Sequence, residues 1–239
     1  MNELLRQLHE AGVHGIKSDK GIILEALEDQ LHNEREIDAL LYKLLLDVKG
    51  LKQVIFQCSR KLLAKLDNVQ KMMTTEGERV IYTRSLAVPI EIQVPSFEIW
   101  PATEQKSISF LAEVMGRSTE RAHAFLRGMK EELPTQADTM FTVYLVNGEA
   151  AGIVLPHIEP DTDREGRMFW IGMHPSYRGK GLGKNLHMIG LYRLQEEFKA
   201  KTYLGSTQID NYPMRNIMAS NGCVERNTVI SLKYVNEDI

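Results

Sequence analysis

The chain has 239 residues, 43% of them hydrophobic, and a formal net charge of −3. This length allows one large domain or two small ones, and the apolar fraction is sufficient for a buried core. The mildly acidic charge provides no overall attraction to nucleic acid. The two cysteines, Cys58 and Cys223, lie far apart and form no C-x-x-C pair, which argues against a disulfide framework or a structural zinc site. We therefore expect no metal and no nucleic-acid partner.

Residues 1–6 do not show the basic stretch and continuous apolar segment of a signal peptide. No apolar run approaches the roughly 18–20 residues that span a bilayer. From these observations we expect a cytoplasmic protein with no membrane partner.

Residues 1–78 are predicted to form a helical N-terminal region, because Gly and Pro are scarce and apolar residues recur at helical spacing. Three roles stay open for these helices: a bundle packed on itself or on the following domain, a homodimer interface, or a DNA-binding module suggested by Arg60, Lys61 and Lys65. The apolar stripes are Ile22, Ile23, Ala26, Leu27 and Leu31; Ile37, Leu40, Leu41, Leu44, Leu45, Val48, Leu51, Val54 and Ile55; and Leu62, Leu63, Leu66, Val69 and Met73.

Residues 74–77 read as a linker, and residues 79–95 as connecting strands, because polar and apolar residues alternate in 80–83 and 90–94. From residue 96 to 239, strand and helix patterns follow one another around a central hairpin. This order indicates an α/β or mixed α+β domain whose sheet has helices on both faces. The predicted strands are 141–146, 150–155, 169–173, 203–209 and 228–234, and the predicted helices are 108–115, 119–133, 185–198 and 213–219.

The most informative segment is Arg178-Gly179-Lys180-Gly181-Leu182-Gly183, which lies between an apolar strand and a helical pattern. A helix start has backbone N–H groups without intrahelical partners and the positive end of the helix dipole. Glycines let an anionic ligand approach those groups closely, and basic side chains add positive charge. The segment therefore predicts a phosphate-binding loop.

Two common nucleotide motifs do not fit this loop. A nucleotide P-loop requires Ser or Thr after its Lys, whereas Asn185 follows Lys184. The dinucleotide fingerprint G-x-G-x-x-G also fails, because its third glycine would fall on Lys184. The remaining pattern is R-x-x-G-x-G, formed by Arg178, Gly181 and Gly183.

This pattern resembles the acetyl-CoA signature Q/R-x-x-G-x-G/A of the GNAT family of N-acetyltransferases. The surrounding run from Ile171 to Lys184 is similar to that family's strand-to-helix junction, and residues 97–103 resemble its first strand. A second stretch, from Asn211 to Cys223, resembles the family's C-terminal motif N-x-x-[AS]-x-x-[LV]-x-x-x-x-G-F. The resemblance covers roughly residues 96–235 and implies a GNAT-like domain over 96–239.

The resemblance implies an enzyme that moves acetyl from acetyl-CoA, as cosubstrate, to a primary amine of a small molecule or peptide by direct attack. The backbone N–H of Met173 is implied as the donor to the thioester carbonyl. Asn211 is implied as a cofactor contact, with a helix N-cap as its alternative role. The implied cofactor-binding residues are Ile171, Gly172, Met173, Arg178, Gly179, Lys180, Gly181, Leu182, Gly183, Lys184 and Asn211.

The proton-transfer groups are less clearly marked. Met218 occupies the position where many family members have a Tyr that protonates the departing thiolate, so Tyr212 and Tyr177 are the nearest candidate acids. Glu165 is the candidate base, with His157, His174 or an ordered water as alternatives. Departures from the motif leave a second function open, a non-catalytic acyl-CoA sensor with the helical region as its interaction partner. Acidic residues in 159–165 hint at a cationic acceptor.

Overall fold

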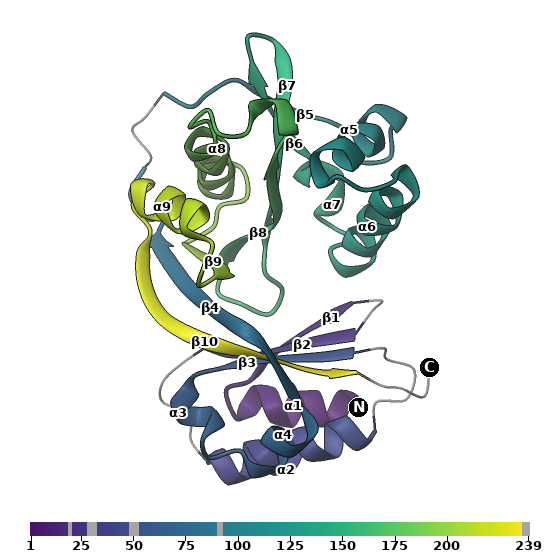
Figure 1. The fold of residues 1–239 in the computed structure, drawn as a ribbon, viewed down its shortest axis with the longest axis vertical. Helices are drawn as coiled ribbons and strands as arrows, with labels where there is room; N and C mark the ends of the chain where they lie inside the picture. Colours follow the sequence, from purple (N-terminus) through teal and green to yellow (C-terminus); the bar gives the residue numbers. More distant parts are fainter. Residues whose placement is uncertain (19–20, 28–32, 48–52, 90–92, 236–239) are drawn as a thin grey trace. The chain divides into compact units, whose positions relative to one another are not determined.

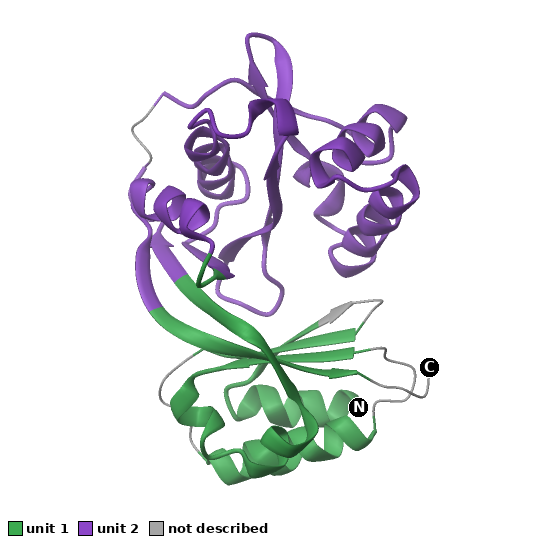
Figure 2. Ribbon diagram, in the orientation of Figure 1, with its two compact units in different colours: residues 1–81, 208–210, 227–239 green, residues 82–207, 211–226 purple. Residues whose placement is uncertain are grey.

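The computed structural model describes residues 1–18, 21–27, 33–47, 53–89 and 93–235. Its strands form a mixed sheet with the order β1-β2-β3-β10-β4-β9-β8-β7-β6-β5 (Figure 1). The chain divides into two compact units (Figure 2). Unit 1 comprises Met1–Ile81, Gln208–Asp210 and Asn227–Ile239, and unit 2 comprises Tyr82–Thr207 and Asn211–Arg226.

Unit 1 is a sheet with helices on one of its faces (Figure 1). Strand β2 pairs in antiparallel fashion with β1 and in parallel with β3. Its helices are α1 (Asn2–Glu10), α2 (Glu34–Leu46), α3 (Arg60–Leu63) and α4 (Asp67–Met72). Its strands are β1 (His14–Ser18), β2 (Gly21–Ala26) and β3 (Gln53–Cys58), together with parts of β4 (Thr74–Ser85) and β10 (Val224–Val235).

The prediction of helix throughout this region is therefore wrong at β1, β2 and β3. In β2 the alternate residues Ile22, Leu24 and Ala26 enter the core, as Val54, Phe56 and Cys58 do in β3. A short apolar run satisfies the strand period as well as the helical one, and pairing with a distant strand decides between them. Two residues of the predicted stripes, Val48 and Leu51, lie outside the described residues, as does Leu31.

The predicted linker and connecting strands also change. Residues 74–77 form the start of β4 instead of a linker, and the predicted strand at 80–83 is confirmed within β4. Residues 90–92 lie outside the described part of the chain. Unit 1 also includes residues from the C-terminal end of the chain. The boundaries 1–78, 79–95 and 96–239 stay a prediction.

In unit 2 the predicted order of helices and strands is confirmed, and the short helix α7 is an addition. The helices are α5 (Gln105–Met115), α6 (Thr119–Glu132), α7 (Ala137–Met140), α8 (Gly183–Glu196) and α9 (Tyr212–Ser220). The strands are β5 (Phe97–Ile99), β6 (Thr142–Val146), β7 (Glu149–Ile158), β8 (Glu165–Met173) and β9 (Thr202–Gln208).

Helices cover both faces of the unit 2 sheet, as the mixed α/β class predicts. Helix α8 lies on one face of β6–β8, and α5 and α6 lie on the other (Figure 1). Val154 of β7 packs with Ile189 on the α8 side, whereas Ile153 packs with Leu111 and Leu126 on the opposite side. Successive residues of β7 thus contribute to two separate cores.

Candidate functional site

Strands β8 and β9 are parallel and diverge along their length. They pair only at Glu165–Thr202 and Gly166–Tyr203, although β8 has nine residues and β9 has seven. The register between β7 and β8 also shifts between Val154 and Pro156, as a bulge does. Beyond its first two residues, β8 therefore has an edge that β9 does not cover.

The backbone N–H groups of Met173 and Ile171 face this open edge. The N–H of His174 donates to the carbonyl of Ala151, 2.9 Å away, so it points toward β7. N–H groups alternate in direction along an extended strand. Those of Met173 and Ile171 consequently point away from β7, on the side where β9 diverges.

The glycine loop follows a 3-10 turn, η1 (Pro175–Tyr177), and ends at the start of α8. Gly179 and Gly181 have φ values of +73° and +75°, a left-handed conformation that favours glycine. Among the described residues, no acceptor is found for the N–H groups of Gly181, Leu182 and Gly183. Helix α8 has no side-chain N-cap and no acid in its first turn. An anion is the complementary partner for this helix start.

The side chain of Arg178 holds the loop in position. Its Nε donates to the carbonyl of Met173 (3.0 Å) and its Nη2 to the carbonyl of Val114 (2.7 Å). These bonds connect the loop to the end of β8 and to α5. Arg178 was predicted to contribute charge to the cofactor, but its guanidinium is engaged by the protein.

The other residues of the loop differ in what surrounds them. The ammonium of Lys180 lies 5.2 Å from the ring centroid of Tyr177. The hydroxyl of Tyr177 donates to the carboxylate of Glu149 at 2.6 Å, and this bond raises the pKa of Tyr177. A Cβ at Gly183 would lie 2.7 Å from Cδ1 of Ile217, so the absence of a side chain lets α8 start close against α9.

Asn211 caps helix α9. Its Oδ1 accepts a hydrogen bond from the N–H of Met214 (3.3 Å), and its Nδ2 donates to the hydroxyl of Thr207 (2.9 Å). The alternative role as an N-cap is thus confirmed, and the cofactor contact stays a prediction. Tyr212, the next residue, is 64% exposed, with its ring 5.6 Å from Cζ of Arg215.

A buried polar network, which the sequence reasoning missed, connects α8, β9 and the end of α9. His187 is fully buried, with its Nε2 3.2 Å from the hydroxyl of Tyr203 and its Nδ1 2.9 Å from Nδ2 of Asn221. Burial, together with the charge of Arg84, lowers the pKa of His187 to about 3. The only sequence signal was a polar residue on the buried side of α8. The network links three elements that follow the glycine loop in the chain.

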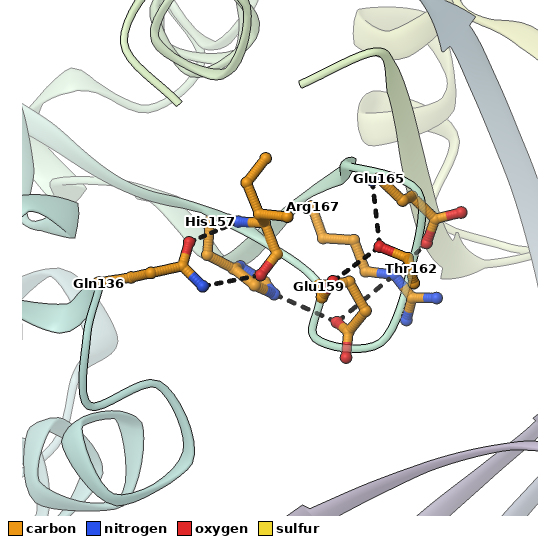
Figure 3. Close-up of polar contacts among 7 residues, drawn as sticks. Gln136, His157, Glu159, Thr162, Glu165 and Arg167 are labelled. Carbon is orange, nitrogen blue, oxygen red and sulfur yellow. Dashed lines mark hydrogen bonds and ion pairs between the residues drawn. The ribbon is translucent and has the colours of Figure 1, made fainter. Parts of the chain in front are cut away.

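Glu165 lies in a cluster of polar residues at the β7–β8 connection (Figure 3). Its Oε1 accepts from Nε of Arg167 at 2.7 Å. The same Nε lies 3.6 Å from Oε2 of Glu159, which is 3.3 Å from Nε2 of His157. Asp163 also has a cationic partner, Lys201. Three of the four acids of this connection, Glu159, Asp163 and Glu165, are therefore paired within the protein. The preference for a cationic acceptor stays a prediction.

Glu165 and Met173 stand at opposite ends of β8. Eight residues of extended strand separate them, which corresponds to about 26 Å at about 3.3 Å per residue. A general base must come within hydrogen-bond reach of the reacting amine, directly or through one water. The two predicted roles, carbonyl donor at Met173 and base at Glu165, therefore cannot be combined in one direct proton transfer.

His174, an alternative base, is occupied by local contacts. Its Nδ1 accepts from the N–H of Ser176 at 3.3 Å and caps the 3-10 turn. Its Nε2 lies 3.4 Å from Oε2 of Glu113, and its ring stacks on Phe110 with 5.8 Å between centroids. His174 thus shapes the turn that precedes the glycine loop.

Within the described ranges, no group of three or more His, Cys, Asp or Glu side chains is arranged to hold a metal ion. None of the helices in the part of the chain that the structure describes is long and apolar enough to cross a membrane.

The domain thus combines parallel strands that diverge with a helix start that has no side-chain cap and follows a glycine loop. Comparison with known families specifies the class of protein. The model of the acetyltransferase (GNAT) family matches residues 105–222, from the start of α5 to the turn before β10. Residues 105–222 belong to this family.

Individual relatives agree with the family assignment. A mycothiol acetyltransferase from Corynebacterium aurimucosum is 31% identical over 121 residues, which are 48% of this chain and 38% of that enzyme. A GNAT-family acetyltransferase from Colwellia psychrerythraea superposes with a TM-score of 0.59 at 14% identity, covering 93% of this chain and 81% of the other. A tandem GNAT protein from the clavulanic acid biosynthesis pathway gives 0.61 at 16%, covering 90% and 75%. Both structural likenesses show a shared fold.

Proposed function

We propose that the protein is an acyl-CoA-dependent N-acyltransferase that moves acetyl from acetyl-CoA to a primary amine by direct attack. The observation that carries this proposal is the uncapped start of α8, next to the uncovered edge of β8. A pyrophosphate is the anion that such a helix start accommodates, and an amide-bearing arm is complementary to strand N–H groups.

In this proposal the N–H groups of Gly181, Leu182 and Gly183 bind the pyrophosphate, and Gly179, Lys180 and Lys184 complete the loop. Arg178 acts by fixing the loop. Ile171, Gly172 and Met173 form the strand edge along which the arm lies, with Asn211 across from it on the β9 side. The N–H of Met173 then meets the arm, and the thioester lies further toward the start of β8.

The reaction needs little covalent help from the protein. The amine nitrogen bonds to the thioester carbonyl carbon, the carbon–sulfur bond breaks, the amine loses a proton and the thiolate gains one. We propose Tyr212 as the acid for the thiolate, because its phenol is exposed beside Asn211. A thioester placed toward the start of β8 brings the amine nearer to Glu165, the proposed base. The acceptor is proposed as a small-molecule or peptide amine.

A second candidate function rests on Met218. This side chain is 2% exposed and adjoins Gly205 on β9, at the position where the family resemblance implies a Tyr. Without that phenol, an acyl-CoA-binding module without turnover is the alternative. Incubation with acetyl-CoA and a pooled amine library separates the two, because the alternative predicts binding with no acetylated product.

The test of the cofactor site is Gly181→Asp, with Gly148→Asp as its matched control. Both glycines have positive φ, +75° and +82°, and an added Cβ meets nothing within 4 Å at either position. Backbone strain is therefore similar, but only Gly181→Asp places a carboxylate where the pyrophosphate is proposed. We expect calorimetry to show loss of acetyl-CoA binding in Gly181→Asp and parental binding in Gly148→Asp. Equal binding by the two variants would refute the site.

A further inference from the structure

The same order of elements occurs twice in the chain. An antiparallel strand pair is followed by a long helix, a strand parallel to the second member of the pair, a short helical segment and a long final strand. In unit 2 the series is β7, β8, α8, β9, α9 and β10. In the first part of the chain it is β1, β2, α2, β3, α3–α4 and β4.

Several of the corresponding elements also agree in length. Helices α2 and α8 have 13 and 14 residues, and strands β3 and β9 have six and seven. The final strands, β4 and β10, have 12 residues each. Strands β1 and β2, with five and six residues, are shorter than β7 and β8, with ten and nine. The agreement thus covers the long helices, the third strands and the final strands, which is more than a strand–helix–strand crossover alone.

The strand order of the sheet is symmetric with respect to the two series. Starting from β1, the order is β1-β2-β3-β10. In the opposite direction, starting from β7, it is β7-β8-β9-β4. The final strand of each series therefore lies beside the third strand of the other. Accordingly, β4 and β10 each contribute residues to both units (Figure 2).

We infer that residues 14–85 are a second, shortened copy of the cofactor-binding half of the domain, in which the cofactor position is closed. The first observation is the pairing of its parallel strands. All six residues of β2 pair with β3, from Gly21–Gln53 to Ala26–Cys58, whereas β8 and β9 pair at two positions. A Cβ at Gly21 would lie 1.9 Å from the carbonyl oxygen of Gln53, which shows how closely the strands approach. Between β2 and β3, therefore, no backbone edge is left free for the extended arm of a cofactor.

The second observation is the start of α2, the counterpart of α8. Asn33 caps it: its side chain accepts from the N–H of Glu36 and donates to the Glu36 carboxylate. Glu36 and Glu34, the latter paired with Lys65, place carboxylates in the first turn. In the sequence, the stretch between β2 and α2, residues 27–33, contains no glycine and includes Glu28 and Asp29. At this helix start the N–H of Glu36 is already hydrogen-bonded, and the nearby carboxylates would repel a phosphate.

Two consequences follow. The chain binds one acyl-CoA instead of two, a statement that rests on the proposed function. Independently of any ligand, the two copies depend on each other for folding, because each provides a final strand to the unit that contains the other's third strand.

Native mass spectrometry with acetyl-CoA tests the first consequence. We expect one bound acetyl-CoA per chain in the parent and none in Gly181→Asp. A second bound molecule, or one retained by Gly181→Asp, would overturn the closed position. Absence of binding in the parent would instead contradict the proposed function, and the duplication would then be decided by the folding measurement.

Urea unfolding tests the second consequence, because both tryptophans, Trp100 and Trp170, lie in unit 2 and report on it alone. Leu41→Ala removes a fully buried side chain of α2 in unit 1, and Leu46→Ala, on the same helix at 62% exposure, is the control. We expect Leu41→Ala to lower the midpoints of the tryptophan and circular-dichroism transitions together, and Leu46→Ala to change neither. If Leu41→Ala leaves the midpoint of the tryptophan transition unchanged, the two copies do not depend on each other for folding, and this consequence is wrong. Ile37→Val makes a smaller cavity on the same helix if Leu41→Ala does not fold.

Discussion

Arg178 reaches from the glycine loop to helix α5, where its Nη2 donates to the backbone carbonyl of Val114 at 2.7 Å. The same guanidinium donates from Nε to the carbonyl of Met173. One side chain therefore joins the loop, the end of β8 and a helix 64 residues earlier in the chain. In the proposed function, this bracing fixes the loop N–H groups in position before acetyl-CoA binds.

The first prediction is that Arg178→Ala weakens acetyl-CoA binding by about ten- to a hundredfold. A hydrogen bond from a charged donor contributes about 1.5–3 kcal/mol, and about 1.4 kcal/mol corresponds to a tenfold change in affinity. Arg178→Lys should recover little of the loss, because an ammonium cannot span the two carbonyls as a planar guanidinium does. Calorimetry measures both. Parental affinity in Arg178→Ala would show that the loop keeps its shape without the brace.

Glu165→Gln tests the proposed base. We expect turnover to fall by about a hundred- to ten-thousandfold, the range of general-base catalysis, with acetyl-CoA affinity unchanged and the acidic limb of the pH–rate profile lost. The control is Asp163→Asn in the same connection, whose carboxylate pairs with Lys201. Turnover within two-fold of the parent would leave Glu165 as the ion-pair partner of Arg167 and move the search for the base to His157 or a water.

The proposed acid is tested by Tyr212→Phe. If its phenol protonates the departing thiolate, turnover should fall by about a hundredfold or more, while acetyl-CoA binding stays parental. Tyr177→Phe is the control, because the hydroxyl of Tyr177 already donates to Glu149. Steady-state kinetics on both variants distinguish the roles. An unchanged rate in Tyr212→Phe would assign the proton to solvent.

The buried imidazole of His187 predicts loss of stability in acid. Its pKa is lowered from 6.5 to about 3 in the folded protein, so between these pH values the unfolded chain binds the proton and the folded one does not. Stability therefore falls as the pH drops below 6.5, by about 1.4 kcal/mol per pH unit. Urea titrations at pH 7 and pH 5 should show that the free energy of unfolding decreases less for His187→Gln than for the parent. Equal decreases would mean that other groups carry the dependence.

Much of unit 2 was predictable from local patterns. The strand before Met173, the glycine loop and helix α8 follow from an apolar run, glycines at alternate positions and a helical repeat, all within a few turns of chain. The helices α5 and α6 follow in the same way. Local sequence was sufficient here because backbone preference and side-chain burial favour the same conformation.

Unit 1 shows where this agreement ends. Residues 21–26 and 53–58 carry apolar residues compatible with both a helix and a strand, and they became strands by pairing with each other over a separation of about thirty residues. That choice depends on hydrogen-bond partners far along the chain, so no local window contains it. The same holds for β10, whose second half completes the sheet beside β3.

The sequence by itself determined the family resemblance and the prediction of a phosphate-binding loop, because glycine spacing and a following helix are local properties of the chain. Only the tertiary structure decided which groups are available to a ligand. It engages the guanidinium of Arg178 with two carbonyls, pairs Glu165 with Arg167, uses Asn211 as a cap, and separates Glu165 from Met173 by the length of a strand. The physical reason is that charge and hydrogen-bonding capacity belong to a residue type, whereas the partner that uses them is set by residues brought together in the fold.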